Sequence, residues 1–178
     1  MKKMLALVAM LAACAWVQAE ECLSVGESVG AFNVVDVTGP SAGKKLCYRC
    51  QYGNRPVVTV FARKMTPEVA SLTKEIDGVV GSNTDKKMAA FVVMVTDQPE
   101  TTETTLKTVA QEQGIKNTPL TTFDGAAGPE GYKLAQDSEV TVMMWVKGKV
   151  AVNKSFKAGE LTKDAVAASV KDTAKILN

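Results

Sequence analysis

The sequence predicts an α/β fold in which a central mixed sheet is flanked by helices and extended by an N-terminal β-hairpin. Two apolar, β-branched runs at residues 57–61 and 88–95 are each followed by a helical pattern. This alternation indicates parallel strands joined by right-handed helical crossovers. Residues 140–152 have the alternation and the central turn of an antiparallel hairpin. Parallel and antiparallel strands together predict a mixed sheet.

The run at residues 57–61 organises the chain. It is short and uninterrupted, which is typical of a strand buried on both faces of a sheet. A helix is expected directly after it, because Thr66 is a good N-cap, Pro67 suits the first helical position and Glu68 adds an acid to the first turn. Apolar residues then recur at helical spacing at Val69, Leu72, Ile76 and Val79.

The segments before this strand predict the N-terminal hairpin. Residues 32–37 have strand character and end at a cluster of turn-forming residues at 38–43. Residues 44–50, KKLCYRC, are expected to form a return strand or a tight turn.

The second half of the chain predicts one more strand–helix unit. Thr102 is expected to cap the helix after residues 88–95, with Leu106, Val109 and Ala110 on its buried side and Gly114 as its end. Residues 115–131 predict a short strand and an irregular segment, and residues 132–136 a helical turn.

The chain is expected to close with the hairpin and a last helix. The hairpin strands are predicted at residues 140–146 and 150–152, with the turn at 147–149. The helix is expected to begin near Thr162, with Leu161 and Val166 in the staple positions around its cap. Its buried stripe is predicted at Val166, Val170, Ala174 and Leu177.

The N-terminus predicts export. Lys2 and Lys3, a short apolar segment and a small-residue cleavage site identify residues 1–19 as a signal peptide. The apolar segment is far shorter than the roughly 20 residues that cross a bilayer. An alternative is a lipoprotein signal, because residues 11–14, LAAC, resemble a lipobox ending at Cys14. In either case we expect an extracytoplasmic protein with an arm at residues 20–30 and one domain at 31–178.

Charge and composition exclude several functions. Without Lys2 and Lys3, 19 basic residues balance 19 acidic ones, so nucleic acid and anionic membranes are not expected partners. The chain contains no histidine, which excludes Ser-His-Asp and Cys-His nucleophiles and histidine-ligated metal sites. No cofactor is expected.

Three cysteines remain after the signal peptide: Cys22, Cys47 and Cys50. In an oxidising compartment, thiols tend to form disulfides, and an odd number leaves one thiol over.

The order of elements resembles the thioredoxin-like superfamily. The segments GNRPVV at residues 53–58, VFA at 60–62 and VTVMMWVKGKV at 140–150 resemble its redoxin branch, which includes alkyl-hydroperoxide-reductase-like peroxiredoxins and periplasmic thiol–disulfide proteins. The resemblance covers most of residues 28–177. It implies a thioredoxin-like fold, and thiol–disulfide exchange or peroxide reduction as the activity of an enzyme of this kind.

The family's catalytic cysteines are missing from the expected place. The resemblance aligns residues 65–68, MTPE, with the Cys-x-Pro-Cys motif, so the proline matches while Met65 and Glu68 replace both sulfurs. No cysteine occurs between residues 61 and 76, and Thr141 stands where thioredoxins carry a cis-proline. The usual active site is therefore expected to be absent.

The remaining candidate site is the C-x-x-C pair Cys47 and Cys50. It could be a displaced redox dithiol, with Arg49 favouring a thiolate, or an inert disulfide that pins the N-terminal hairpin. A metal site would need more ligands than Cys22 can add. The redox hypothesis implies other extracytoplasmic thiol or disulfide proteins as partners. The alternative is a non-catalytic binding or structural protein of the cell envelope, and the sequence leaves catalysis and oligomeric state open.

Overall fold

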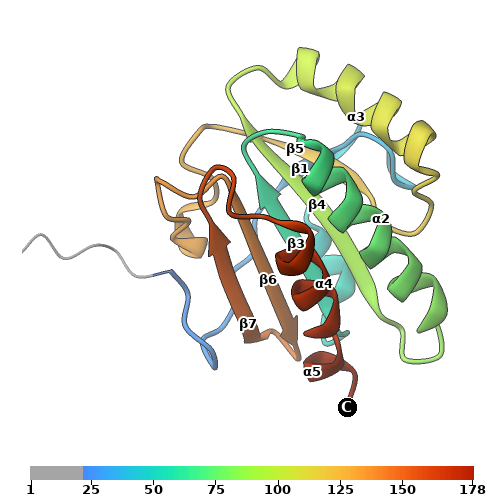
Figure 1. The fold of residues 1–178 in the computed structure, drawn as a ribbon, viewed down its shortest axis with the longest axis vertical. Helices are drawn as coiled ribbons and strands as arrows, with labels where there is room; N and C mark the ends of the chain where they lie inside the picture. Colours follow the sequence, from blue (N-terminus) through green and yellow to red (C-terminus); the bar gives the residue numbers. More distant parts are fainter. Residues whose placement is uncertain (1–21) are drawn as a thin grey trace, which may run out of the picture.

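The computed structural model describes residues 22–178 and places seven strands of this part of the chain in one mixed sheet (Figure 1). The strand order is β2-β1-β5-β4-β3-β6-β7, with β3, β4 and β5 parallel to one another and the other pairs antiparallel. The strands are β1 (Val34–Asp36), β2 (Lys45–Leu46), β3 (Val57–Ala62), β4 (Ala89–Thr96), β5 (Leu120–Asp124), β6 (Val140–Val146) and β7 (Lys149–Phe156). The predicted mixed sheet is confirmed. The predicted signal peptide at residues 1–19 and Cys14 lie outside the described residues.

Strand β3 is buried along its whole length, as the apolar run predicts. Val58, Val60 and Ala62 face one hydrophobic cluster, and Val57 and Phe61 face the other. This division follows from the period of two in an extended strand, which sends successive side chains to opposite faces. The strand therefore needs cover on both sides of the sheet.

The two faces are covered by different kinds of structure. Helices α2 (Pro67–Ser82), α3 (Pro99–Gln113), α4 (Lys163–Lys171) and α5 (Ala174–Leu177) supply the apolar residues of the first cluster. The second cluster is covered by the arm before β1, the short helix α1 (Tyr48–Tyr52) and the segment around the 3-10 turn η1 (Glu130–Tyr132). In Figure 1 helices α2, α3, α4 and α5 lie in front of the sheet and α1 lies behind it.

Helix α2 begins as predicted. The Thr66 hydroxyl accepts a hydrogen bond from the Val69 amide at 3.3 Å, and Pro67 is the first helical residue. Val69, Leu72 and Ile76 are buried, while Val79 is half-buried against the same cluster. The helix therefore starts immediately after the carboxyl end of β3.

The expected N-terminal hairpin is present, but residues 44–50 differ from the prediction. Strands β1 and β2 pair through Val34 and Leu46, which confirms the return strand. The return strand ends at Leu46, and α1 begins at Tyr48. The sequence analysis missed this helix because a single turn buries too few residues to produce a periodic pattern.

Three further boundaries were predicted wrongly. Helix α3 begins at Pro99, and Thr102 lies inside its first turn, where its hydroxyl bonds to the Gln98 carbonyl at 2.8 Å. The turn expected at residues 132–136 ends at Tyr132. The last helix stops at Lys171 and resumes as α5, which leaves Ala174 exposed and buries Ile176 instead.

The closing hairpin and the cap of the last helix are confirmed, although β7 begins at Lys149 and runs to Phe156, beyond the strand predicted at residues 150–152. Lys147 and Gly148 form its turn with φ values of 54° and 71°, which suits a two-residue turn that needs positive φ at both positions. Thr162 caps α4, and Leu161 and Val166 are buried around it. Among residues 22–178, no helix combines the length and apolarity needed to cross a membrane.

Candidate functional site: a disulfide on helix α1

A groove of about 470 Å³ lies at the carboxyl ends of β3 and β4, where open α/β sheets usually place their ligands. Its walls include Arg63, Lys64 and Met65 after β3, Thr96 at the end of β4, and Thr102 in α3. No cysteine is among the residues that line it.

Residues 65–68 occupy the position that the resemblance assigned to them, at the start of α2. The Met65 thioether packs partly buried against the first hydrophobic cluster, and Glu68 is exposed in the first turn. A thioether cannot ionise to a thiolate, so this helix end offers no sulfur nucleophile. The described groove therefore lacks the thiol chemistry expected at this place in the fold.

Arg63 has a structural part in the groove that the sequence analysis missed. Its guanidinium donates to the carbonyl of Ser138 at 2.8 Å, to that of Ala135 at 3.4 Å, and to that of Ala126. It thereby holds the irregular segment after β5 to the end of β3. Lys64, the cation that the sequence places beside it, is exposed.

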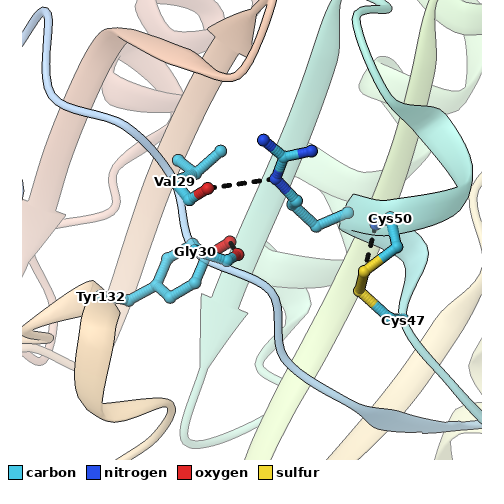
Figure 2. The surroundings of a disulfide bond; sticks show 6 residues. Val29, Gly30, Cys47, Cys50 and Tyr132 are labelled. Atoms are coloured by element: carbon cyan, nitrogen blue, oxygen red, sulfur yellow. Dashed lines mark hydrogen bonds between the residues drawn. A yellow bond between two sulfur atoms is a disulfide. The ribbon is translucent and has the colours of Figure 1, made fainter.

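The Cys47 and Cys50 sulfurs form a disulfide, with the two Cα atoms 5.2 Å apart (Figure 2). Cys47 is the N-cap of α1, and its Sγ accepts a hydrogen bond from the Cys50 amide at 3.1 Å. Cys47 is half-buried, whereas Cys50 is exposed. The pair therefore combines one exposed cysteine with one half-buried cysteine whose sulfur accepts a backbone hydrogen bond.

Tyr48, between the two cysteines, anchors α1 in the interior. Its ring is only 2 % exposed, and its hydroxyl donates to Oδ2 of Asp36 at 2.8 Å. Burial, and then the hydrogen bond to the Asp36 carboxylate, raise the pKa of Tyr48 well above its usual value. The phenol thus remains a hydrogen-bond donor through the physiological pH range.

Asp36 also fixes the loop that precedes β2. The carboxylate is fully buried and accepts from the Gly39 amide at 2.7 Å and the Ser41 amide at 2.8 Å. With Tyr48 it has three donors, which satisfies a buried anion that would otherwise be costly. The disulfide is therefore attached to a rigid, fully hydrogen-bonded support.

Arg49 has a structural role that the sequence analysis did not predict. Its Nε donates to the Val29 carbonyl at 3.1 Å, so the side chain reaches across to the N-terminal arm. Figure 2 shows this bond beside the contact of Tyr132 with Gly30, where the Tyr132 hydroxyl donates at 2.8 Å. Arg49 therefore pins the arm and does not bond to either sulfur.

The disulfide lies on the other side of the sheet from α2. The Tyr52 ring stacks on Tyr48 with centroids 5.2 Å apart, and both rings pack on Phe91 of β4. These residues belong to the second cluster, whereas α2 covers the first. The sulfurs are thus separated from the groove at residues 63–65 by the sheet itself.

The third cysteine does not join this pair. The Cys22 Sγ lies 3.8 Å from the Ser155 hydroxyl and is a free, half-buried thiol. The Ser155 hydroxyl in turn lies 3.1 Å from the hydroxyl of Thr141, the residue that stands where thioredoxins carry a cis-proline. The described residues contain no cis peptide bond. Met143, Met144 and Trp145 are fully buried in β6 and pack in the core.

No protein-family profile matches the chain, and no curated protein matches it. Solved structures, in contrast, do match this chain. The thioredoxin domain of a thiol-disulfide oxidoreductase from Bacteroides vulgatus is 14% identical with a TM-score of 0.59, and the match covers 83% of this chain and 99% of that one. Peroxidoxin BcpB from Mycobacterium tuberculosis is 17% identical with a TM-score of 0.60, covering 86% and 96%.

A third match is the yeast mitochondrial 1-Cys peroxiredoxin, which is 14% identical with a TM-score of 0.60. The match covers 84% of this chain and 75% of that one. At these identities the likeness establishes the fold. The chain has the thioredoxin-like fold, as the sequence analysis predicted.

Proposed function

We propose that the chain is an exported thioredoxin-like protein that exchanges thiols and disulfides through Cys47 and Cys50. The observation that carries the proposal is the asymmetry of the pair: Cys50 is an exposed residue, whereas Cys47 is half-buried and its sulfur accepts a hydrogen bond from the Cys50 amide at 3.1 Å. Exchange requires an accessible sulfur to attack and a leaving sulfur that tolerates negative charge. The two cysteines divide these roles.

The first step of reduction follows from this division. An incoming thiolate attacks Sγ of Cys50, which forms a mixed disulfide with Cys50 and breaks the Cys47–Cys50 bond. Cys47 leaves as a thiolate, with both electrons of the broken bond. The Cys50 amide already donates to this sulfur, so a hydrogen bond stabilises the negative charge as it develops.

A second thiolate completes the exchange. It attacks the partner's sulfur in the mixed disulfide, which releases an oxidised partner disulfide and leaves Cys50 as a thiolate. Two protons from the two partner thiols end on Cys47 and Cys50. In total, two electrons pass from the partner thiols to the pair, and the reverse sequence oxidises a partner.

We also propose that this chemistry takes place outside the cytoplasm. The predicted signal peptide at residues 1–19 supports export, and a disulfide is stable in an oxidising compartment. The proposed partners are extracytoplasmic thiol or disulfide proteins. Mass spectrometry of the protein purified from its native host tests this point: a mature N-terminus at Glu20 supports a signal peptide, a lipidated Cys14 supports the lipoprotein alternative, and an intact Met1 contradicts both.

The reduction potential of the folded protein tests the redox role. Equilibration with glutathione buffers should give a potential well above about −300 mV, the value below which structural disulfides fall. A bond that is reduced only after denaturation would overturn the proposal.

Two single variants test the division of roles. With Cys22→Ser in both proteins to remove the free thiol, Cys47→Ser leaves the exposed Cys50, which should react with an aromatic disulfide reagent faster than the half-buried Cys47 left in Cys50→Ser. Serine can cap α1 as cysteine does, so helix start is preserved in the first variant. Equal rates, or a faster reaction of Cys47, would contradict the proposed order of attack.

The second candidate is a non-catalytic thioredoxin-fold protein of the cell envelope with a structural disulfide. It is favoured by the loss of sulfur at residues 65–68 and by the firm attachment of α1 through Tyr48 and Asp36. Turnover of a disulfide substrate by the wild type, abolished in Cys47→Ser, would exclude it.

A further inference from the structure

A long segment around the disulfide carries only positive charge. Between Asp36 and Glu68 the chain has no acidic residue and six basic ones: Lys44, Lys45, Arg49, Arg55, Arg63 and Lys64. The whole chain is close to neutral without its first two lysines, so this segment is a marked local excess. Asp36, at its border, is fully buried and bonded to Tyr48, Gly39 and Ser41.

The fold brings two more lysines to the same place. A Cβ on Gly148 would lie only 2.6 Å from Nη2 of Arg49, so the β6–β7 turn lies directly against the Arg49 guanidinium. The Lys147 amide also donates to the Asn54 carbonyl at 3.2 Å, one residue before Arg55. Lys147 and Lys149 flank this glycine and are both exposed.

We call the resulting area the basic surface and define it as Lys44, Lys45, Arg49, Arg55, Lys147 and Lys149. None of these six forms an ion pair with a carboxylate of residues 22–178. The nearest acid of the arm is Glu27, next to the bridge between Ser28 and Lys149, and its carboxylate accepts the Ser24 amide. The charge of the basic surface is therefore open to a partner.

The disulfide lies within the field of this surface. Arg49 is adjacent to Cys50 in the chain, and consecutive Cα atoms lie about 3.8 Å apart. The Debye length is about 8 Å at physiological ionic strength, so the charge of Arg49 acts on an anion at Cys50 without full screening, and the neighbouring lysines add to the positive potential. A uniform positive field raises the local concentration and association rate of anionic partners.

We propose that the redox partner of Cys47 and Cys50 is a protein that presents its thiols or disulfide on an acidic surface. This inference rests on the proposed function and adds the partner's charge. Acidic residues around the partner's sulfur would pair with Lys44, Lys45, Lys147 and Lys149 as its sulfur approaches Cys50. A neutral or basic partner would have no such attraction.

Oxidation of the reduced, folded protein by three small disulfides of different charge tests the inference. The probes are the dianionic 3,3′-dithiodipropionate, the neutral 2-hydroxyethyl disulfide and the dicationic cystamine. Each rate is divided by that of the same probe with N-acetylcysteine amide, a thiol without a basic surface. At about 0.01 M salt the normalised rate with the anionic probe should exceed that with the cationic probe about tenfold. This ratio should approach one at about 1 M salt, where the Debye length is about 3 Å.

Two double variants separate the local and the tertiary parts of the surface. Lys44→Gln with Lys45→Gln removes charges next to Cys47 in sequence, and Lys147→Asn with Lys149→Gln removes charges that only the fold brings close. Asparagine before glycine suits the positive φ of this turn, so the second variant should fold. Each should reduce the charge preference several-fold. The control, Lys74→Gln with Lys163→Gln, removes two exposed charges from α2 and α4 on the other face of the sheet and should leave the preference unchanged.

The outcomes distinguish this inference from the proposed function. Oxidation by all three probes at equal normalised rates, or an equal effect of the control variant, overturns the acidic partner and leaves the redox role standing. Failure of every probe to oxidise the folded, reduced protein overturns the proposed function itself.

Discussion

The Tyr48 hydroxyl donates a 2.8 Å hydrogen bond to Oδ2 of Asp36, and this bond joins the helix of the disulfide to strand β1. Both residues are buried, with Tyr48 2 % exposed and Asp36 fully buried. Because Tyr48 lies between the two cysteines in sequence, the pair cannot move far while this bond holds. The redox candidate is thus attached to the sheet through one phenol and one carboxylate.

Tyr48→Phe should lower the free energy of unfolding by about 1.5–3 kcal/mol, because a hydrogen bond to a charged, buried acceptor is lost. Urea denaturation measures the change. Tyr52→Phe is the matched control: its hydroxyl lies 3.5 Å from the Ala90 carbonyl, a weak contact, so its loss should cost much less. Equal losses in the two variants would contradict the special role of Asp36.

The three tyrosines, Tyr48, Tyr52 and Tyr132, should resist ionisation in the folded protein. Burial is the largest cause that raises the pKa of each above the ordinary 10.0. Since each folded-state pKa is raised, its contribution to stability is complete below pH 10 and is lost as the pH rises above it. The near-ultraviolet absorbance of tyrosinate, followed against pH, should therefore rise only when the fold is lost.

The same pH dependence gives a second measurement. Above pH 10 the free energy of unfolding should fall with increasing pH, and Tyr48→Phe should reduce the slope by about one proton. Tyrosinate absorbance that appears near pH 10 while the circular dichroism of the folded state persists would contradict this prediction.

Arg63→Met should loosen the segment between β5 and β6. The variant removes the guanidinium that donates to the Ser138 and Ala126 carbonyls, and unpaired polar groups of this kind cost about 1–3 kcal/mol of stability. Hydrogen exchange should show faster exchange in residues 125–138 than in the wild type. Lys64→Met, which changes the exposed neighbouring cation, should leave both stability and exchange nearly unchanged.

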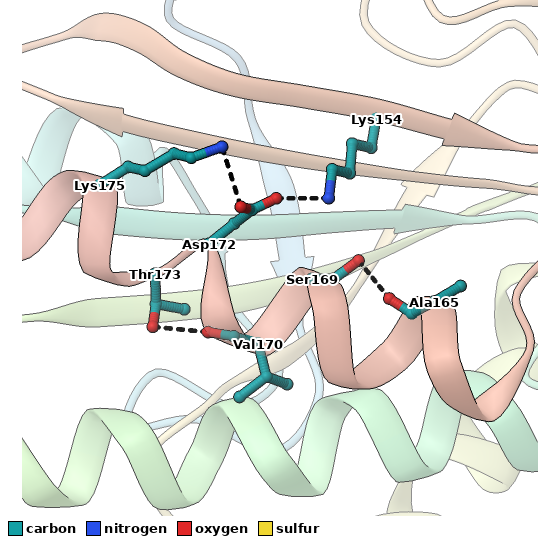
Figure 3. A network of polar contacts seen from close by, with 7 residues as sticks. All are labelled: Lys154, Ala165, Ser169, Val170, Asp172, Thr173 and Lys175. Carbon is teal, nitrogen blue, oxygen red and sulfur yellow. Dashed lines mark hydrogen bonds and ion pairs between the residues drawn. The ribbon is translucent and has the colours of Figure 1, made fainter.

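Asp172→Asn should weaken the attachment of the C-terminal helices to β7. Asp172 lies between the ammonium groups of Lys154 and Lys175, the latter at 2.9 Å (Figure 3). Burial works to raise the pKa of Asp172, but hydrogen bonds from the two lysines lower it overall. A depressed pKa contributes stability above the unfolded-state value of about 3.9 and loses it as the pH falls.

The wild type should therefore lose stability on acidification more steeply than Asp172→Asn does, as thermal denaturation between neutral and acidic pH can show. Asp137→Asn is the control, because its pair with Lys157 is exposed by more than half on both sides. Exposed pairs of this kind contribute little. A control that flattens the acid profile as much as Asp172→Asn would contradict the prediction.

The parts of the fold that sequence predicted are those in which local patterns suffice. Residues 57–61 form a strand because a continuous β-branched run can only be buried on both faces, and Thr66 with Pro67 satisfies the start of α2 within the chain itself. Helix α1 was missed, and the start of α3 was placed at Thr102 instead of Pro99. Helix α1 depends on distant contacts such as the bond from Tyr48 to Asp36, and α3 begins after an unusual N-cap residue, Gln98.

The candidate site shows the same division. The C-x-x-C spacing identified Cys47 and Cys50 as the candidates, and the sequence itself shows that residues 65–68 contain no cysteine. The bond from Arg49 to the Val29 carbonyl was not predicted, because the two residues are 20 apart in the chain and make no sequence pattern. The contribution of Arg63 depends on carbonyls more than 60 residues away and was equally invisible.

The sequence by itself determined the α/β class, the missing cysteines at the start of α2 and the spacing of the remaining pair, because each depends on residue identity and short-range periodicity. The tertiary structure decided that Cys50 is the exposed cysteine, that Asp36 holds α1 through Tyr48, and that the β6–β7 turn adds its lysines to the basic surface. These features arise from side chains that meet across the sheet. Burial and hydrogen bonding between segments far apart in the chain are properties of the folded state, and no local pattern encodes them.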